Sequence, residues 1–249
     1  MLRTLKAVHN FAIHASDGEI GRIEDFYFDD EQWAVRYLVV KTGGWLFGKE
    51  VLISPRSVTR VEFEDHCVAV NLTRDQVRNS PDIDTDKPIS RQKESEYHLY
   101  YNFPVYWGGM GLWGRDMLPV EDEAAESEKP EPDKETHNTH LRSANEICGY
   151  RVHAVDGDSG HVDDLVVEEE TWAVRYMVLD TGNWLPGKKV LISPKWVDQM
   201  VWAKSKVNVN TSLDKIKFAP DFDPKEDITR EYEEKLFEYY EMHKYWEEE

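Results

Sequence analysis

The stretch WAVRYLVVKTGGWLFGKEVLISP, residues 33–55, recurs with few changes as WAVRYMVLDTGNWLPGKKVLISP, residues 172–194. Both stretches consist of strand-forming residues on either side of a Gly-containing turn, and both end at Ser-Pro. Alternate residues from Trp33 to Val39 fall on one face of a strand, and most of the residues between them are apolar too. A strand that is apolar on both faces is covered on both sides. The repeated stretch therefore predicts a structural role.

The repeat extends far beyond the quoted stretch. Its two copies are 139 positions apart, and the same spacing relates, without a gap, Gly21 to Gly160, Trp45 to Trp184, Pro81 to Pro220, Tyr100 to Tyr239 and Trp107 to Trp246. The copies run from about residue 8 to 107 and from about residue 147 to 246. Solenoid repeats are much shorter, at roughly 20 to 50 residues. The sequence therefore predicts a tandem duplication of a small domain.

Each copy predicts five or six short strands joined by tight turns. Asp17-Gly18 and Asp156-Gly157 stand between extended runs, and Asp-Gly is a strong hairpin signal because both residues tolerate the left-handed conformation. No helical stretch separates the strands, which suits a small closed or half-closed antiparallel barrel. A helical tail follows each barrel, with Ser90 or Thr229 as its N-cap. Pro104 predicts an earlier end for the first helix.

The resulting fold class is mainly β, with two small antiparallel barrels in tandem, each followed by a C-terminal α-helical tail. We expect a first barrel domain with its tail at residues 1–107 and a second at residues 142–249. Residues 108–141 between them begin with a Gly- and Trp-containing segment and continue as an acidic stretch without large apolar residues. Such a stretch cannot bury enough surface to offset its ordering entropy, so it is predicted to be a flexible linker.

Composition excludes several classes of function. The formal net charge of -19, from 30 basic and 49 acidic residues, would repel nucleic acid, which proteins bind through clustered Lys and Arg. The N-terminal stretch lacks the apolar run of a signal peptide, and no segment approaches the roughly 20 apolar residues of a spanning helix, so we expect a cytoplasmic protein without a membrane span. Cys67 and Cys148 occupy non-equivalent positions, which predicts neither a disulfide framework nor a zinc site.

At these residues the sequence resembles the PRC-barrel family, the small β-barrel found in the photosynthetic reaction centre H subunit and in the ribosome maturation factor of the small subunit. The resemblance covers about 70 residues of each copy. Its elements are an Asp-Gly-x-x-Gly hairpin with an Asp four residues on, a Trp-x-Val-Arg-Tyr strand, a Thr-Gly-x-Trp-Leu-x-Gly turn and a Val-Leu-Ile-Ser-Pro strand. The turn glycines of the hairpins are Gly18, Gly21, Gly157 and Gly160.

The resemblance implies a protein-binding and assembly module without a catalytic centre or cofactor. We therefore expect a non-enzymatic adaptor, whose acidic body favours a protein partner with a basic surface. Three alternatives stay open: a ribosome-associated maturation role through a basic ribosomal protein, peripheral docking on a photosynthetic or other membrane complex, and a metal-dependent hydrolase. Pairing of the two barrels within the chain, or a homodimer, also stays open.

Two polar pairs recur in the repeat. Asp25 and Arg36 correspond to Asp164 and Arg175, and all four lie next to apolar strand residues. Each Asp could be a perturbed general base, but no nucleophile or oxyanion donor accompanies it. We predict structural ion pairs instead, between Asp25 and Arg36 and between Asp164 and Arg175.

His14 and His153 also correspond, each three residues before the turn Asp. Two or three ligands per copy at the rim of a hairpin fall short of a metal-binding set. The sequence therefore predicts no metal site.

Aromatic residues outside the barrel pattern are the candidates for binding a partner, because such side chains dominate protein interfaces. They compete with a second interpretation, in which the aromatic residues of the tails pack over their own barrels. The segment GGMGLWGRDM, residues 108–117, has no counterpart in the second copy and is the best single candidate for a partner-binding segment. The candidate interaction residues are Trp45, Trp184, Tyr106, Trp107, Trp113, Tyr245 and Trp246.

Overall fold

The structure, a computed structural model, describes residues 1–46, 48–81, 89–107, 109–119, 140–182 and 187–247. The chain forms two compact units. The first-repeat unit comprises Ala7–Ser143 and Glu170–Ala173, and the second-repeat unit comprises Met1–Lys6, Ala144–Glu169 and Val174–Glu249. The acidic linker predicted from the sequence lies almost entirely outside the described residues.

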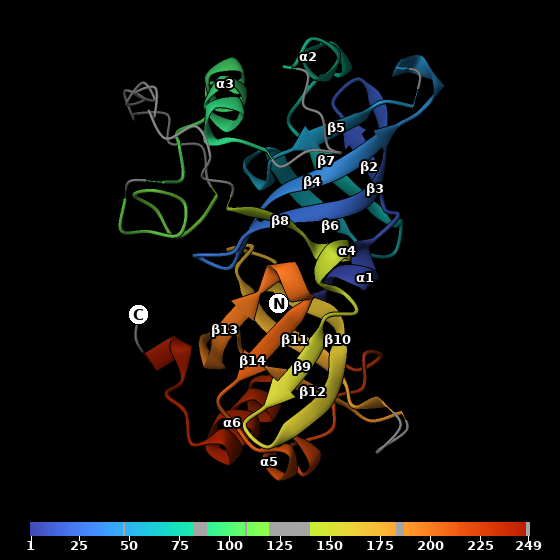
Figure 1. Cartoon of the computed structure of the whole chain (residues 1–249). Coiled ribbons are helices and arrows are strands. Elements are labelled where there is room, and N and C mark those ends of the chain that lie inside the picture. The colour runs from blue at the N-terminus through green and yellow to red at the C-terminus, as the bar shows by residue number, and fades with distance from the viewer. Residues whose placement is uncertain (47, 82–88, 108, 120–139, 183–186, 248–249) are drawn as a thin grey trace. The chain divides into compact units, whose positions relative to one another are not determined.

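The sheet of the first-repeat unit has seven strands in the order β5-β4-β3-β2-β7-β6, with β8 paired to β3 (Figure 1). All pairs are antiparallel except β2 and β7, which run parallel. The fold is thus mainly β, as predicted, although one pairing departs from the antiparallel pattern. The strands are β2 (Ala12–Ala15), β3 (Gly18–Asp29), β4 (Ala34–Thr42), β5 (Glu50–Ile53), β6 (Val58–Glu62), β7 (Cys67–Val70) and β8 (Leu141–Ser143).

The second-repeat unit has the same topology. Its seven strands follow the order β12-β11-β10-β9-β14-β13, with β1 paired to β10, and its parallel pair is β9 with β14. The strands are β1 (Leu2–Thr4), β9 (Arg151–Ala154), β10 (Gly157–Glu168), β11 (Val174–Asp180), β12 (Lys189–Ile192), β13 (Val197–Val201) and β14 (Lys206–Val209).

Two strands do not follow the predicted division of the chain at residues 107 and 142. The strand β1 precedes the first repeat in the sequence but pairs with β10 of the second-repeat unit. The strand β8 precedes the second repeat but pairs with β3 of the first-repeat unit. Each unit therefore takes one strand from the segment that leads into the other repeat.

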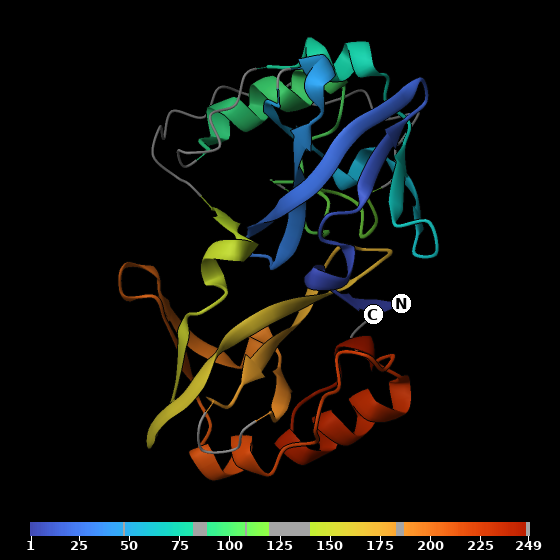
Figure 2. The ribbon, with the colours of Figure 1, turned by 90° about the vertical axis from the view of Figure 1, so that its right-hand side faces the viewer.

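A short helix and a longer one follow the last strand of each repeat and lie beside the strands of their own unit (Figure 2). The two long helices begin at the predicted N-caps, since the Ser90 hydroxyl accepts from the amide of Lys93 and the Thr229 hydroxyl from the amide of Tyr232. The helices of the chain are α1 (Leu5–Val8), α2 (Arg74–Arg78), α3 (Arg91–Tyr101), α4 (Ala144–Ile147), α5 (Leu213–Lys217) and α6 (Arg230–Tyr240).

The expectation of a shorter first helix is wrong, because α3 and α6 both contain 11 residues. Each ends at a residue in the left-handed conformation, Asn102 after α3 and Glu241 after α6. Such a residue closes a helix by turning its amide back to the last carbonyl groups. The chain has therefore already left the helix two residues before Pro104.

The second glycine of each hairpin motif lets the backbone of its strand approach the backbone of the next strand closely. A Cβ atom on Gly21 would lie 2.0 Å from the carbonyl oxygen of Lys41, and one on Gly160 would lie 2.0 Å from that of Asp180. No side chain fits at such a distance. These positions let β3 and β10 cross closely over the strands that follow them.

The core of the first-repeat unit joins the sheet to α3. Tyr37 of β4 packs edge-on against Tyr97 of α3, with ring centroids 5.2 Å apart. The Tyr97 hydroxyl receives a hydrogen bond from the amide of Ser54 and donates one to the carbonyl of Leu52. The helical tail therefore packs over its own sheet. The buried cluster comprises Tyr37, Val39, Leu52, Ile89, Tyr97, Phe103 and Leu141.

Candidate interaction site

A loop follows the tail of the first repeat and is anchored by one tryptophan. This loop, residues 109–119, is called the Trp113 loop below. The Trp113 side chain is only 1% exposed. Arg36 donates to the carbonyl oxygen of Leu112 at 2.6 Å, and Arg56 donates to that of Trp113 at 2.7 Å. Both guanidinium groups also lie within cation–π distance of the Trp113 ring. Two buried arginines thus hold the backbone of the loop from beneath.

Glycines give the Trp113 loop its tight path. The amide of Gly111 donates to the carbonyl of Gly114 at 2.8 Å, and the amide of Trp113 donates to the carbonyl of Asp116 at 2.8 Å. A Cβ atom on Gly109 would lie 2.0 Å from the carbonyl oxygen of Gly114. A bulkier residue at that position would force the loop open. The loop is therefore a compact, internally bonded element.

The anchored loop presents apolar side chains outward. Met110 is fully exposed, and Met117 and Leu118 are 50% and 41% exposed. Methionine is flexible and polarizable, and it is common at surfaces that bind other proteins. The loop therefore combines a buried aromatic anchor with exposed apolar side chains.

Beneath α3 lies a buried carboxylate with several donors. Glu94 is 2% exposed. Its carboxylate accepts a short hydrogen bond from the Tyr106 hydroxyl, and the guanidinium of Arg91 lies 3.3 Å away. The guanidinium of Arg36 stacks 3.9 Å from the centre of the Tyr106 ring. The tail of the first repeat is therefore bound to its sheet through a fully enclosed polar network.

The network determines which ring nitrogen of a neighbouring histidine carries the proton. The Nδ1 atom of His98 lies 3.0 Å from the carbonyl oxygen of Pro104, and its Nε2 atom lies 3.0 Å from the Tyr37 hydroxyl. Because a carbonyl can only accept, Nδ1 carries the proton and Nε2 accepts from Tyr37. Burial and the nearby Arg56 lower the pKa of His98 to about 3, and burial raises the pKa of Glu94 to about 7. Glu94 and His98 are therefore buried and hydrogen-bonded within the protein, and a substrate does not reach their side chains.

The second repeat contains the same buried carboxylate. Glu233 accepts hydrogen bonds from the hydroxyl of Tyr176 at 2.7 Å and from that of Tyr245 at 2.8 Å. The guanidinium of Arg230 lies 3.0 Å from it and stacks 4.1 Å from the Trp246 ring. These residues stand 139 positions after Glu94, Tyr37, Tyr106, Arg91 and Trp107. Because both repeats contain the network, it belongs to the shared fold.

The candidate interaction residues fall into three groups. Tyr106, Trp113 and Tyr245 are buried in their own units, where each lies between a helix or loop and the sheet. Trp107 and Trp246 are partly buried and stack on arginines of α3 and α6. Trp184 and the side chain of Trp45 lie outside the described residues.

The predicted pairing of Asp25 with Arg36 is wrong. Arg36 lies 3.5 Å from the carboxylate of Asp29 and donates to the side chain of Gln32 at 2.5 Å. Asp25 is opposite Val39 in the register of β3 and β4, three positions from Arg36. Its carboxylate instead accepts from the hydroxyl of Ser143 at 2.5 Å. The carboxylate that the sequence assigned to an arginine therefore holds the strand β8.

The second repeat departs from the prediction in the same way. Arg175 pairs with Glu168 at 2.6 Å rather than with Asp164. Asp164 accepts from the amides of Lys6, at 3.3 Å, and of Leu165, at 2.8 Å. Burial raises the pKa of Asp164 to about 6. Like Asp25, this carboxylate contacts the segment that leads into the other repeat, here at Lys6 of α1, two residues after β1.

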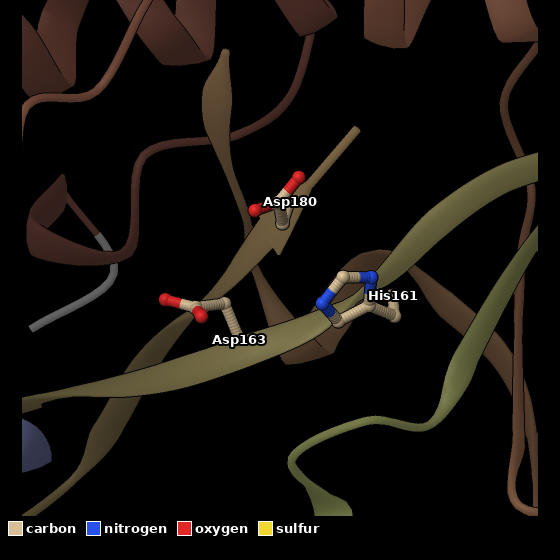
Figure 3. A group of neighbouring side chains, drawn as sticks. All are labelled: His161, Asp163 and Asp180. Carbon is tan, nitrogen blue, oxygen red and sulfur yellow. The ribbon is translucent and has the colours of Figure 1, made fainter. Parts of the chain in front are cut away.

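The two hairpin histidines do not meet a set of ligands. His14 is exposed, and His153 is partly buried with its Nδ1 atom 2.7 Å from the carboxylate of Asp158. Among the residues that the structure describes, the one close group of three metal-type ligands lies elsewhere, and consists of His161, Asp163 and Asp180 (Figure 3).

The His161 group is better explained as part of an ion-pair network. Asp163 lies 2.8 Å from the ammonium of Lys6 and 2.6 Å from that of Lys189. Burial raises its pKa, but the hydrogen bonds from these lysines outweigh burial and lower it overall. A carboxylate between two ammonium groups is a poor ligand for a further cation. In the first repeat the equivalent positions are Arg22, Glu24 and Lys41, of which two are basic.

Two features were missed in the sequence. The buried carboxylates Glu94 and Glu233 stand in helices rich in acidic residues, and only their shared spacing of 139 positions distinguished them. The strands β1 and β8, called the exchanged strands below, lie outside the predicted repeat, which starts at about residue 8, although Leu2-Arg3-Thr4 and Leu141-Arg142-Ser143 continue it at the same spacing.

Comparison with known proteins gives a family for the first repeat. Residues 12–77 match the family model of the PRC-barrel domain, and this range runs from the start of β2 into α2. A protein of Deinococcus radiodurans, described as uncharacterized, is 32% identical over 93 residues. The aligned part covers 32% of this chain and 33% of the relative, so the match spans about a third of the relative's length.

None of the helices in the described residues combines the length and the apolar character that a membrane crossing needs. The strands β9 to β14 and the helix α5 repeat the order of β2 to β7 and α2. The chain therefore contains a PRC-barrel domain at residues 12–77, and its second repeat has the same order of strands as that domain.

Proposed function

We propose that the chain is a non-enzymatic adaptor that binds a protein partner through the Trp113 loop. The PRC-barrel domain is of the protein-interaction and assembly type, and its family is non-catalytic. The observation that carries the proposal is the contrast within the loop between the buried anchor Trp113 and the exposed Met110 and Met117. An ordered loop that exposes apolar side chains loses little conformational entropy when it binds.

The buried titratable groups support a role without catalysis. Glu94 and His98 are 2% and 1% exposed, and each is hydrogen-bonded within the protein. A catalytic acid or base must come within hydrogen-bond reach of its substrate. These groups are tied to the fold of the tail instead.

The partner is expected to carry apolar side chains framed by basic ones. The loop offers Met110, Met117 and Leu118, and the chain around it has a formal net charge of -19. Such a charge steers association toward basic surfaces and repels acidic ones. Raised salt should therefore slow association more than it weakens the apolar contact.

The test is a quantitative capture of proteins from the native lysate with the whole chain as bait. The variant Met110→Asp with Met117→Asp places charge on the loop without touching its anchor, and we expect it to lose the proteins that wild type enriches. The matched control is Val155→Asp with Phe218→Asp, at two exposed apolar positions of the second-repeat unit. Equal recovery with both double variants would refute the loop as the binding element.

A further inference from the structure

The exchanged strands β1 and β8 dock in the same way on the two units. Leu2, Arg3 and Thr4 lie opposite Glu168, Val167 and Val166 of β10. Leu141, Arg142 and Ser143 lie opposite Asp29, Phe28 and Tyr27 of β3. Every one of these pairs is related to its counterpart by the spacing of the repeat. The register is therefore a property of the receiving residues, 166–168 of β10 and 27–29 of β3, which are called the β10 edge and the β3 edge below. Each edge accepts a strand from outside its own repeat.

The side chains of the two strands are recognised by equivalent acids. Arg3 donates to the carboxylate of Glu169 at 2.8 Å, and Arg142 donates to that of Asp30 at 2.7 Å. Glu169 and Asp30 each follow directly after the strand that receives the arginine. Charged hydrogen bonds of this geometry are stronger than neutral ones. Each edge thus selects an extended Leu-Arg segment that ends in Thr or Ser.

Additional acids surround the strand β1. Arg3 also reaches the carboxylate of Asp227 at 2.7 Å, and Lys6 lies 2.8 Å from that of Asp163. Leu5 is buried, with 3% of its surface exposed. The β10 edge and the acids beside it therefore offer backbone pairing and negative charge to β1 and to the first residues of α1. This combination is the mode of recognition in which a peptide adds a strand to a sheet.

We propose that the strand β1 also pairs with the β10 edge of a second copy of this chain, so that two chains exchange their N-terminal strands. All contacts of β1 are the same whether its own chain or a second copy supplies the edge. The equilibrium between the monomer and the strand-exchanged dimer then depends on the protein concentration and on the effective concentration of the tethered strand. It does not depend on any new contact. The strand-exchanged dimer is favoured as the protein concentration rises.

The test uses two single-cysteine chains, both with Cys67→Ser and Cys148→Ser. One carries Leu2→Cys and a tag, and the other carries Glu168→Cys. These positions face each other across β1 and β10, and the Cα separation of an antiparallel pair, about 4.5–5.5 Å, lies within the range of a disulfide. The two chains are expressed together, purified and oxidised. We expect a disulfide-linked heterodimer whose fraction grows severalfold as the two chains are concentrated before oxidation.

Two controls decide the interpretation. Asp198→Cys, an exposed acid on β13 of the same unit, replaces Glu168→Cys, and should give severalfold less heterodimer. The double variant with Leu2→Cys and Glu168→Cys in one chain reports pairing within the chain. If it closes internally while the single variants yield no more heterodimer than the Asp198→Cys control, exchange between chains is refuted. Failure of the double variant to form a disulfide in any arrangement would refute the β1 pairing itself.

Discussion

The Tyr245 hydroxyl donates a 2.8 Å hydrogen bond to the carboxylate of Glu233, which is only 3% exposed. The bond connects the chain after α6 to the helix itself, 12 positions earlier. Because Glu233 also accepts from Tyr176 of β11, one carboxylate joins the sheet, the helix and the end of the tail. The second repeat is thus closed by one buried carboxyl group.

Removing one hydrogen-bond donor from Glu233 should destabilise the second-repeat unit. Tyr245→Phe leaves Glu233 with Tyr176 and Arg230, and we expect the free energy of unfolding to fall by about 1–2 kcal/mol. Urea denaturation followed by fluorescence measures it. Tyr100→Phe is the matched control, because its hydroxyl donates to a carbonyl at an exposed site, and it should cost less than about 0.5 kcal/mol. Equal losses would show that Glu233 does not depend on Tyr245.

Burial raises the pKa of Glu94 from 4.5 to about 7, which makes stability depend on pH. Between these values the folded chain holds a proton that the unfolded chain has released. The contribution of Glu94 to the free energy of unfolding is therefore fully present below about pH 4.5 and falls as pH rises to 7, by up to about 1.4 kcal/mol per pH unit. Denaturation curves at several pH values measure the slope.

The variant Glu94→Gln isolates that contribution, because the amide does not titrate. Its unfolding free energy should fall less with rising pH than that of wild type over the window from about pH 4.5 to 7. Glu96→Gln, on the exposed side of the same helix, should keep the wild-type slope. A Glu94→Gln curve parallel to wild type would contradict the raised pKa.

Close backbone approach at Gly21 predicts a severe effect of one methyl group. Gly21→Ala would place a Cβ atom 2.0 Å from the carbonyl oxygen of Lys41, and the strands must separate to admit it. We expect a loss of at least about 2 kcal/mol in unfolding free energy, measured by thermal denaturation. Gly44→Ala, where a Cβ atom meets nothing within 4 Å, should stay within about 0.5 kcal/mol of wild type. Similar melting temperatures for the two variants would contradict the approach.

The ion pair between Arg36 and Asp29 predicts that loss of the Asp29 charge destabilises the protein more than loss of the Asp25 charge. Asp29→Asn keeps a side-chain oxygen for the amides of Glu31 and Gln32, to which Asp29 is bonded, but removes the charge facing a fully buried guanidinium. We expect a loss of about 3 kcal/mol in urea denaturation. Asp25→Asn should cost about 1 kcal/mol. The reverse order would restore the pairing that the sequence predicted.

The sequence predicted the repeat, the β class and the helix N-caps because these depend on local signals. Alternating apolar residues and Asp-Gly turns at Gly18 and Gly157 mark strands and hairpins directly. Ser90 and Thr229 were recognisable because a capping hydroxyl needs only its position before a helical stretch. The match of residues 12–77 to the PRC-barrel domain agrees with that part of the prediction.

The remaining features depend on contacts between residues distant in sequence. Asp25 and Arg36 were paired because both are polar residues on neighbouring strands, but irregularities in the register of β3 and β4 at Ile23/Asp25 and Tyr27/Phe28 separate them. Glu94 has the sequence context of an ordinary surface residue of an acidic helix, and only its burial beneath the tail reveals its role. A three-residue strand such as β1 gives no periodic signal at all.

Because β1 and β8 pair with strands of the other repeat, a mutation in either strand affects a fold encoded in the other half of the gene. A substitution at residues 2–4 acts on the fold of residues 144–249, and one at residues 141–143 acts on the fold of the first repeat. Two separate chains of one repeat each could form these two sheets only if each supplied its first strand to the other. A chain that contains both repeats keeps them at a ratio of one to one, so that neither sheet is left without its seventh strand.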